Sequence, residues 1–306
     1  MTAPSLVAIL RARAARGSVA PHGDGARVAL AIEGGGMRGV VSAGMVAGLE
    51  ALGLTGAFDA VYGSSAGAIN GAYFLAGQAA FGATIYSEDI NNRSFIDLTR
   101  PLRGRPIVDL DFLLNDVAVR RKPLHVDRVL ASPAPLLALA TDVATTGATV
   151  LADFADAQAL FGALGAGARM PVIAGDPVVY RGRAYLDASL SEPIPIVSAE
   201  SAGFTHVLVL LTRPDTAEHR LSWFDRWYVV PRLTRVSPAL ADRYVTRFGP
   251  YRDTIDGLRA GRGPAGRSAA VTVRTAGPAV SKLERRSEVL AAAAAAGRDA
   301  VLALFA

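Results

Sequence analysis

Short apolar runs alternate with helical patterns through the first part of the chain. Residues 27 to 34 (RVALAIEG) form an apolar run that ends at glycines, as a buried strand does. Residues 38 to 52 place apolar side chains at helical spacing, and the second apolar run, 57 to 63, leads directly into a helical pattern over 64 to 78. Two strand–turn–helix units within about 50 residues predict a parallel sheet.

The remaining pattern extends this α/β arrangement. Residues 83 to 123 are more polar and suggest an excursion across the sheet edge or a lid. After them we predict two strands within 135 to 153, a helix over 156 to 169, a hairpin over 177 to 187, a strand over 204 to 214, helices around 236 to 260, a strand at 269 to 275, and an alanine-rich helix from about 281. No internal repeat and no long linker divides the chain.

The sequence therefore predicts a single α/β domain, in which helices flank a central, mainly parallel sheet. We expect an N-terminal amphipathic segment at 1–26, the main domain at 27–214, and a basic extension of helices and a strand at 215–306 that packs on the same domain. A chain of 306 residues that is 51% hydrophobic is long enough for one large core.

Composition excludes several kinds of chemistry. The chain has no cysteine, so it has neither a disulfide nor a thiolate site. The four histidines show no paired ligand spacing, which argues against a metal, and we expect no cofactor; they are His22, His125, His206 and His219. No apolar run reaches the ~20 residues of a membrane span. The N-terminus lacks a typical cleavable leader, so we expect a cytoplasmic protein, with peripheral contact to the inner face of the membrane as an option.

Positive charge is concentrated in the C-terminal third. The net charge is +5, but residues 212 to 306 hold 16 Arg and Lys against 9 Asp and Glu, a net +7. Such a face could contact an anionic bilayer, although an arginine-rich solvated surface is the more ordinary interpretation. We expect no nucleic-acid partner, and the sequence leaves the oligomeric state open.

The glycines of residues 32 to 40 (IEGGGMRGV) allow two interpretations. Gly34, Gly36 and Gly39 satisfy the GxGxxG pattern of a dinucleotide-binding turn, but backbone N–H groups before a helix can also stabilise an oxyanion. A dinucleotide site needs an acidic residue at the end of the second strand. Asp59 instead opens that strand, which places its carboxylate at the opposite edge of the sheet.

The end of the second strand carries the sequence GSSAG at 63 to 67. This GxSxG pattern between a strand and a helix is typical of a nucleophile elbow, with Ser65 as the nucleophile. The serine needs a base. His206 opens a buried strand and His219 lies in a polar loop, whereas Asp187 ends a strand that we interpret as parallel and precedes small residues. Asp187 is therefore the favoured base, although an aspartate here could also simply cap a turn.

These motifs resemble those of patatin-like phospholipases, especially the bacterial ones. The resemblance rests on GGGMRG at 34 to 39, GSSAG at 63 to 67, ARMP at 168 to 171 and YLDASLSEPIP at 185 to 195, and it covers residues 27 to about 214. It implies a patatin-like fold and a Ser65–Asp187 dyad without histidine. It also implies an oxyanion site formed by Gly35, Gly36, Met37 and Arg38. The family aspartate is normally followed by glycine, and here Ala188 and Ser189 follow.

The resemblance implies a lipid acyl hydrolase of phospholipase A or lysophospholipase type, with a phospholipid or another lipid ester as substrate. An esterase of small soluble esters and a non-catalytic lipid- or nucleotide-binding module remain as alternatives. Arg38 could reinforce the oxyanion site or orient an acidic headgroup, or it could cap local carbonyls. The aromatic residues at 223 to 228 could touch lipid, but at this spacing they more often form a buried face.

Overall fold

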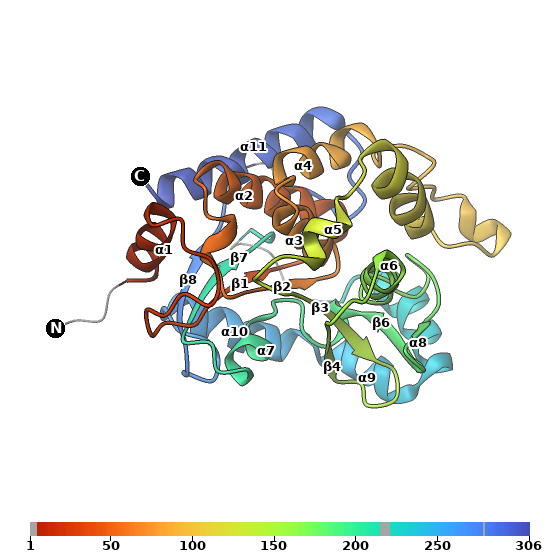
Figure 1. The fold of residues 1–306 in the computed structure, drawn as a ribbon. Helices are drawn as coiled ribbons and strands as arrows, with labels where there is room; N and C mark the ends of the chain where they lie inside the picture. Colours follow the sequence, from red (N-terminus) through yellow and green to blue (C-terminus); the bar gives the residue numbers. More distant parts are fainter. Residues whose placement is uncertain (1–4, 215–220, 278) are drawn as a thin grey trace.

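The computed structural model describes residues 5–214, 221–277 and 279–306, and within them an eight-stranded sheet forms the centre of the molecule (Figure 1). The strands are β1 (Val28–Ile32), β2 (Ala60–Ser64), β3 (Leu136–Asp142), β4 (Ala148–Leu151), β5 (Val178–Tyr180), β6 (Arg183–Asp187), β7 (His206–Leu210) and β8 (Ala269–Val273). Their order is β5-β6-β3-β2-β1-β7-β8, and β4 pairs with β3. The four pairings among β3, β2, β1, β7 and β8 are parallel, so the predicted mainly parallel sheet is confirmed.

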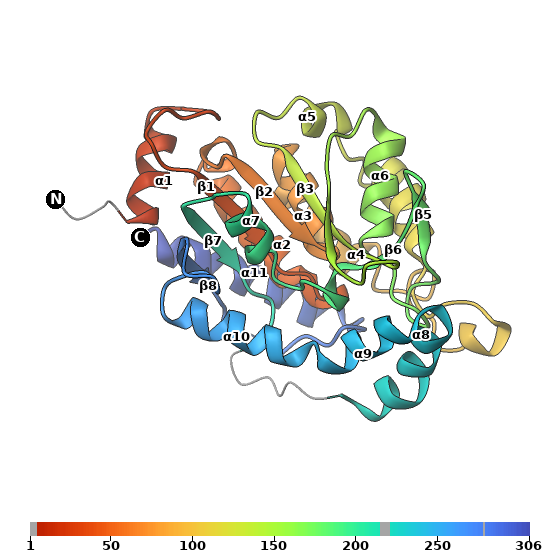
Figure 2. The same cartoon turned by 90° about the horizontal axis from the view of Figure 1, so that it is seen from below.

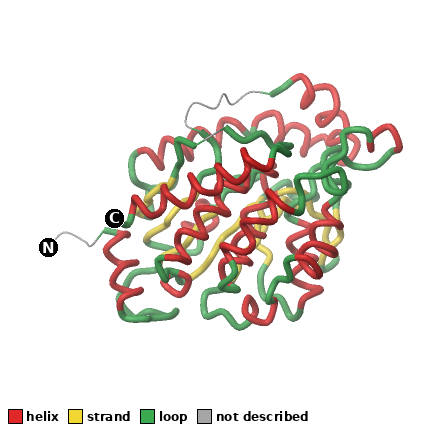
Figure 3. The backbone as a smooth tube through the Cα atoms, turned by 90° about the horizontal axis from the view of Figure 1, so that it is seen from above, coloured by secondary structure: helices red, strands yellow, loops and turns green. Residues whose placement is uncertain are grey.

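Helices cover both faces of this sheet (Figures 1 and 2). One face is covered by α2 (Val40–Ala51), α3 (Ala66–Leu75), α4 (Ala79–Glu88) and α11 (Ser287–Leu304), and Figure 3 shows these helices lying above the strands. The other face carries α7 (Ile196–Ser201) and α10 (Phe248–Arg259). The fully buried residues of β1 and β7 show why both layers are needed, since an apolar parallel strand must be covered on each side.

The remaining helices lie around these layers. They are α1 (Leu6–Ala15), α5 (Val126–Leu130), α6 (Ala157–Ala166), α8 (Val230–Val236) and α9 (Pro238–Thr246), with short 3₁₀ turns η1 (Gly36–Gly39), η2 (Thr55–Ala57), η3 (Arg100–Arg103) and η5 (Ala188–Leu190), and π-helical segments η4 (Phe112–Arg121) and η6 (Asp225–Val229). Among the described residues, we find no helix that combines the length and the hydropathy of a membrane span.

The alanine-rich helix α11 packs closely against α2. A Cβ at Gly44 of α2 would collide with the backbone carbonyl of Ala294, and one at Gly297 of α11 would collide with that of Val41. Glycine at these two positions lets the helix backbones approach. Together with β8, which pairs with β7, this contact joins the C-terminal part of the chain to the sheet and its helical cover.

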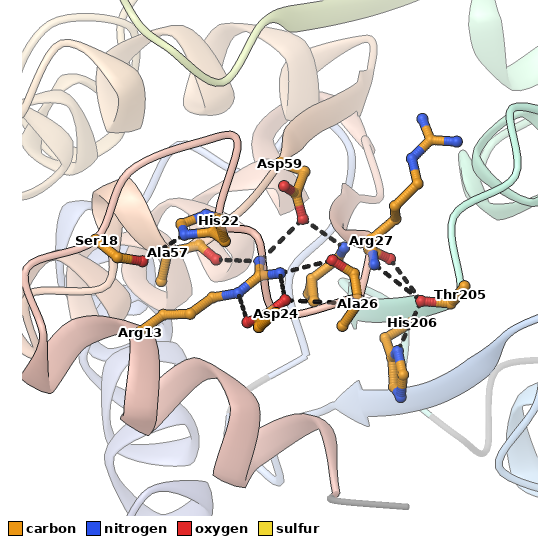
Figure 4. Close-up of polar contacts among 11 residues, drawn as sticks. Arg13, Ser18, His22, Asp24, Ala26, Arg27, Ala57, Asp59, Thr205 and His206 are labelled. Carbon is orange, nitrogen blue, oxygen red and sulfur yellow. Dashed lines mark hydrogen bonds and ion pairs between the residues drawn. The ribbon is translucent and has the colours of Figure 1, made fainter.

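The N-terminal helix α1 is tied to the amino end of the sheet by one arginine (Figure 4). Arg13 is fully buried, and its guanidinium group donates to Asp24 and to Asp59 at 2.8 to 2.9 Å. It also donates to the backbone carbonyls of Ala57 and Ala26. Asp59 precedes β2 and so lies at the amino end of that strand, as expected from the sequence.

Two segments differ from the sequence interpretation in detail. The polar stretch at 83 to 123 buries a set of apolar side chains that includes Phe95, Ile107 and Leu113, and it forms part of the core. The last helix begins at Ser287, later than the predicted position near 281. The reason is local, because the Glu284 carboxylate accepts hydrogen bonds from the backbone N–H groups of Arg285 and Arg286.

Candidate active site

Ser65 lies in a strained turn between β2 and α3. Its backbone angles are φ 53° and ψ −125°, a conformation that L-residues rarely adopt. The glycines of the GxSxG sequence leave room for this turn. A Cβ at Gly63 would collide with the backbone of Ala68, and one at Gly67 would collide with the carbonyl of Ile32. The strand therefore passes sharply into the helix, as in a nucleophile elbow.

The elbow brings Ser65 into contact with Asp187. The Ser65 hydroxyl donates to Asp187 Oδ2 at 2.8 Å, across 122 positions of sequence. The other carboxylate oxygen, Oδ1, accepts from the backbone N–H of Ser189 at 2.8 Å. Ser65 is 8% exposed and Asp187 is 6% exposed, so this hydrogen bond is largely shielded from solvent. One oxygen of Asp187 thus faces the serine while the other is held by the backbone.

The sheet register explains this contact. In β3, Leu139 is paired with both Ser64 and Val150, and its neighbour Ala140 is paired with both Thr149 and Asp187. Because Val150 and Thr149 belong to the same strand, β4, they occupy one side of β3. Ser64 and Asp187 therefore share the other side, where the ends of β2 and β6 meet. The interpretation of the strand before Asp187 as parallel is wrong, since β6 runs antiparallel to β3.

Backbone contacts hold Asp187 in position. Its N–H donates to the carbonyl of Arg169 at 2.7 Å, and its carbonyl accepts from Thr141 Oγ1 at 2.8 Å. Ala188, which replaces the usual glycine, is fully buried and is not among the residues with positive φ. It starts the turn η5 with angles open to any L-residue, so this position does not require glycine in this chain.

The glycine turn after β1 packs directly on the elbow. A Cβ at Gly34 would lie only 2.9 Å from the Cβ of Ser65. Gly35 and Gly36 have φ values of 155° and 60°, which favour glycine. The N–H groups that follow are engaged. Met37 donates to the carbonyl of Lys282 at 3.1 Å, and Arg38 donates to that of Gly35 at 3.2 Å. Within residues 5–214, 221–277 and 279–306, the N–H groups of Gly35 and Gly36 have no hydrogen-bond acceptor.

The described histidines lie away from this pair. His206 begins β7, at the opposite end of the strand, and its Nδ1 lies 2.9 Å from Thr205 Oγ1. Desolvation by burial, followed by the positive charge of Arg13, lowers the pKa of His206. His22 contacts Ser18, and His219 lies outside the described residues. Across the described part of the chain, no three His, Cys, Asp or Glu side chains gather in a way that could hold a metal ion.

Ser65 and Asp187 open into a cleft with apolar walls. The apolar side chains lining it come from α3, α4, the segment 83 to 123, and the stretch before β5; they include Ile69, Ile85, Ile90, Phe95, Leu113 and Ile173. None of these residues could be recognised as part of a site from the sequence, because their apolar pattern is the same as that of core residues. Arg38, Arg213 and Lys282 also line the cleft. Arg213 and Lys282 were likewise missed, since single cations in a basic region carry no signal.

The aromatic residues at 223 to 228 do not form the buried face favoured from their spacing. Trp223 and Trp227 are each 66% exposed, and Tyr228 is 50% exposed. Tyr228 stacks on the half-buried Phe224 with ring centroids 5.2 Å apart, and it meets Trp223 edge-on. The favoured interpretation as a buried face is therefore wrong, because this segment presents its aromatic side to solvent.

Comparisons with known proteins agree with these motifs. A family model described as patatin-like phospholipase matches residues 30–200, which is more than half of the chain. The chain is also 28% identical over 203 residues to a protein of Escherichia coli (strain K12) named uncharacterized protein YjjU. That alignment covers 65% of this chain and 56% of YjjU, so the chain spans little more than half of the relative's length.

Proposed function

Because this chain belongs to the patatin-like phospholipase family, we propose that it is a lipid acyl hydrolase that cleaves carboxylic esters through Ser65 and Asp187. Hydrolysis of lipid esters is the general activity of the family. The serine mechanism and the dyad are our inference for this chain. The observation that carries it is the 2.8 Å hydrogen bond from Ser65 Oγ to Asp187 Oδ2 at the base of an apolar cleft.

In this mechanism Asp187 acts first as a base and then as an acid. It takes the hydroxyl proton as Ser65 Oγ attacks the ester carbonyl, and a tetrahedral oxyanion forms. Collapse of this intermediate breaks the bond to the alcohol, which leaves with the proton from Asp187, and the acyl group stays on Ser65. A water then gives its proton to Asp187 and attacks the acyl carbonyl; as the acyl–Oγ bond breaks, Asp187 returns the proton to Ser65 Oγ, which releases the fatty acid and restores the serine.

We assign oxyanion stabilisation chiefly to the N–H groups of Gly35 and Gly36. The supporting observations are their lack of acceptors among the described residues and the contact of Gly34 with Ser65. Met37 and Arg38, which the family resemblance also implies, have N–H groups that already donate to Lys282 and Gly35. In our proposal these two residues shape the loop, and the side chain of Arg38 adds positive charge beside it.

The apolar walls favour lipid esters over small soluble esters, because a long acyl chain can bury apolar surface there.

We further propose that the aromatic patch of Trp223, Trp227 and Tyr228 touches the bilayer surface. Exposed tryptophan and tyrosine are suited to the membrane interface, and the surrounding C-terminal third carries the excess of arginine. In this arrangement the enzyme is peripheral and draws its substrate from the membrane.

Labelling with a fluorophosphonate tests the proposed function directly. The reagent should attach to Ser65, with the corresponding mass increase on the peptide that contains it, and Ser65→Ala should abolish both labelling and hydrolysis of a lipid ester. Ser64→Ala is a suitable control, because the Ser64 hydroxyl donates to the carbonyl of Glu192 and not to Asp187. Absence of labelling in folded protein would favour a non-catalytic binding module.

A further inference from the structure

Three cationic side chains line the same cleft as Ser65 and Asp187. They are Arg38 from η1, Arg213 after β7, and Lys282 before α11. Arg213 and Lys282 lie beyond residues 30–200, where the family model matches, so the family assignment says nothing about them. The catalytic proposal uses neither side chain.

Two of these residues, Arg38 and Lys282, lie against the loop that packs on the nucleophile. The side chain of Arg38 folds over Gly35, since a Cβ there would lie 3.1 Å from Arg38 Nε. The main chain of Lys282 packs on Gly36, where a Cβ would lie 2.9 Å from the Lys282 carbonyl oxygen. Since neighbouring Gly34 contacts Ser65, the loop joins these cleft-lining cations to the place where the ester would react.

The acidic residues of the cleft leave a positive excess. Two carboxylates line it, those of Glu33 and Asp187, against three cations. Asp187 is engaged by Ser65 and Ser189. Glu33 is 1% exposed, and it accepts from Thr212, from the N–H of Arg213 and from the hydroxyl of Tyr251. In the described part of the chain, no carboxylate lies within ion-pair distance of Arg38 or Lys282.

Arg213 is held so that its terminal nitrogens remain available. Its guanidinium carbon lies 4.5 Å from the centre of the Tyr251 ring, and its Nε lies 3.3 Å from Glu33 Oε1. These contacts fix the plane of the group from one side. Among the described residues, the two terminal nitrogens of Arg213 make no hydrogen bond with another side chain or carbonyl. The planar fork of donors can therefore be offered to a ligand.

The electrostatics agree with an anion site. Desolvation, followed by the neighbouring charges of Arg213 and Arg38, lowers the pKa of Lys282 to about 8. Desolvation also lowers the pKa of Arg38; the negative charge of Glu33 opposes this effect, and the positive charge of Arg213 adds to it. Gathering like charges is unfavourable by itself, and a bound anion would relieve the repulsion.

We propose that Arg213 and Lys282, together with Arg38, bind the phosphate group of the lipid substrate while its ester lies at Ser65. This assignment deepens the proposed function and rests on it. The chemistry supports phosphate because arginine pairs with phosphate oxygens through two parallel hydrogen bonds and lysine adds a point charge. The preferred substrate is then an ester whose glycerol carries a phosphodiester, and a neutral glyceride with the same acyl chain is the poorer one.

The test compares two esters with one acyl chain, a lysophosphatidylglycerol and a monoacylglycerol. We expect wild-type protein to have a higher kcat/KM on the phosphate ester by about tenfold or more. Arg213→Gln and Lys282→Met should each lower this ratio about tenfold, and Arg213→Lys should keep part of it. Arg252→Gln, an exposed cation on α10, should leave the ratio unchanged. A wild-type ratio near one, or variants that lose activity equally on both esters, would overturn the proposal.

A binding measurement separates this site from the catalytic proposal. Ser65→Ala protein should bind dihexanoyl phosphatidylglycerol in calorimetry, and Lys282→Met in the same background should weaken binding about tenfold. Inorganic phosphate should bind much more weakly than the lipid; equal or tighter binding of phosphate would overturn the assignment to a headgroup. If the wild-type protein shows neither hydrolysis nor fluorophosphonate labelling, the catalytic proposal fails, and the calorimetry still decides whether the anion site exists.

Discussion

The cations at the two ends of the parallel strands differ in how their charges are paired. At the amino end, Arg13 is fully buried and is matched by two carboxylates, Asp24 and Asp59 (Figure 4). At the carboxyl end, Arg38 and Lys282 lie in a cleft where no carboxylate of the described residues pairs with them. The charge of Arg13 is paired with carboxylates, whereas the charges of Arg38 and Lys282 are not.

This difference separates a structural role from a binding role. The guanidinium of Arg13 uses its donors on two carboxylates and two backbone carbonyls, so it closes the amino end of the sheet and has nothing left for a ligand. A buried charge that is fully paired contributes to the fold, whereas like charges that gather without ion-pair partners, such as half-buried Arg38 and exposed Lys282, repel one another until an anion binds. Parallel sheets typically bind ligands at the carboxyl ends of their strands, which is where the unpaired cations lie.

The largest expected effect concerns the catalytic end. Asp187→Asn keeps the shape of the side chain but removes the proton acceptor for Ser65, so kcat on a lipid ester should fall by about 10²–10⁴-fold. The measurement is steady-state hydrolysis by purified variants whose fold is checked by circular dichroism. His206→Ala is the matched control, since this residue lies at the amino end of β7, and it should retain most of the activity. A folded His206→Ala protein as inactive as Ser65→Ala would contradict the dyad.

The next effect should appear at the amino end, in stability. Arg13→Met leaves Asp24 and Asp59 without their cation, and breaking a buried ion pair in this way should lower the free energy of unfolding by about 3 kcal/mol. Urea denaturation measures this change. Arg38→Gln should lower the free energy of unfolding much less, because no carboxylate of the described residues lies within ion-pair distance of this arginine and its Nε makes only a 3.4 Å hydrogen bond to Thr212 Oγ1.

Replacing the partners of Arg13 sharpens this test. Asp24→Asn with Asp59→Asn, combined with Arg13→Met, removes the whole charge cluster and should recover part of the lost stability.

The pKa of Asp24 is held well below its usual range, chiefly by the hydrogen bond from Arg13. Stability from this pair is therefore present above the unfolded pKa of about 4 and is lost as the pH falls through the folded pKa. If wild-type protein and Arg13→Met had the same free energy of unfolding, the proposed structural role of Arg13 would be wrong.

Much of the catalytic end could be predicted because its residues follow each other in recognisable local patterns. The strand, the tight turn and the helix around Ser65 are encoded within residues 57 to 78, and Gly63 and Gly67 are required by contacts within that unit or with the adjacent strand. The position of Asp59 at the amino end of β2 also followed from local order, and this excluded the dinucleotide interpretation.

Features that depend on distant pairing could not be predicted. The antiparallel direction of β6 is set by its hairpin with β5 and by its register on β3, which local composition does not reveal. The sequence pattern places Arg13 as a polar residue of an amphipathic helix, yet it is buried because it meets Asp24 in the following loop and Asp59, 46 positions along the chain. The cleft cations Arg213 and Lys282 come from separate segments of the chain, and only the folded structure brings them together. Which face of 223 to 228 is exposed is likewise decided by packing.

The next prediction concerns binding of the basic C-terminal third of the chain to membranes. Trp223→Ala with Trp227→Ala removes two exposed indoles and should weaken binding to anionic vesicles by about tenfold or more, with little change in stability. Cosedimentation with anionic and neutral vesicles measures this. Val19→Ala, another exposed apolar residue, serves as the control. Binding that is equal on neutral and anionic vesicles, or insensitive to salt, would show that the basic surface is merely solvated.

The smallest expected effect is a pH dependence of the substrate preference, which we expect from Lys282 at the carboxyl end of the strands. Lys282 faces Arg38 of η1, Arg213 after β7, Arg247 before α10 and Asp187 at the end of β6, and its pKa of about 8 places its loss of charge between neutral and mildly alkaline pH. If the protonated lysine contributes about tenfold to recognition of phosphate, the preference for lysophosphatidylglycerol over monoacylglycerol should fall about fivefold from pH 7 to pH 9.

The ratio of kcat/KM values isolates this lysine. A phosphodiester keeps its single charge over the whole pH range, and titration of the catalytic groups affects both esters alike, so it cancels in the ratio. Because Lys282 is protonated below its pKa, the preference is complete at the lower pH and declines as the pH rises. Lys282→Met should show a low ratio that no longer changes with pH, while Arg252→Gln should follow the wild-type curve. A wild-type ratio that stays constant or rises between pH 7 and pH 9 would show that the lysine does not recognise the anion. The role of Lys282 in the cleft would then be structural, like that of Arg13 at the amino end.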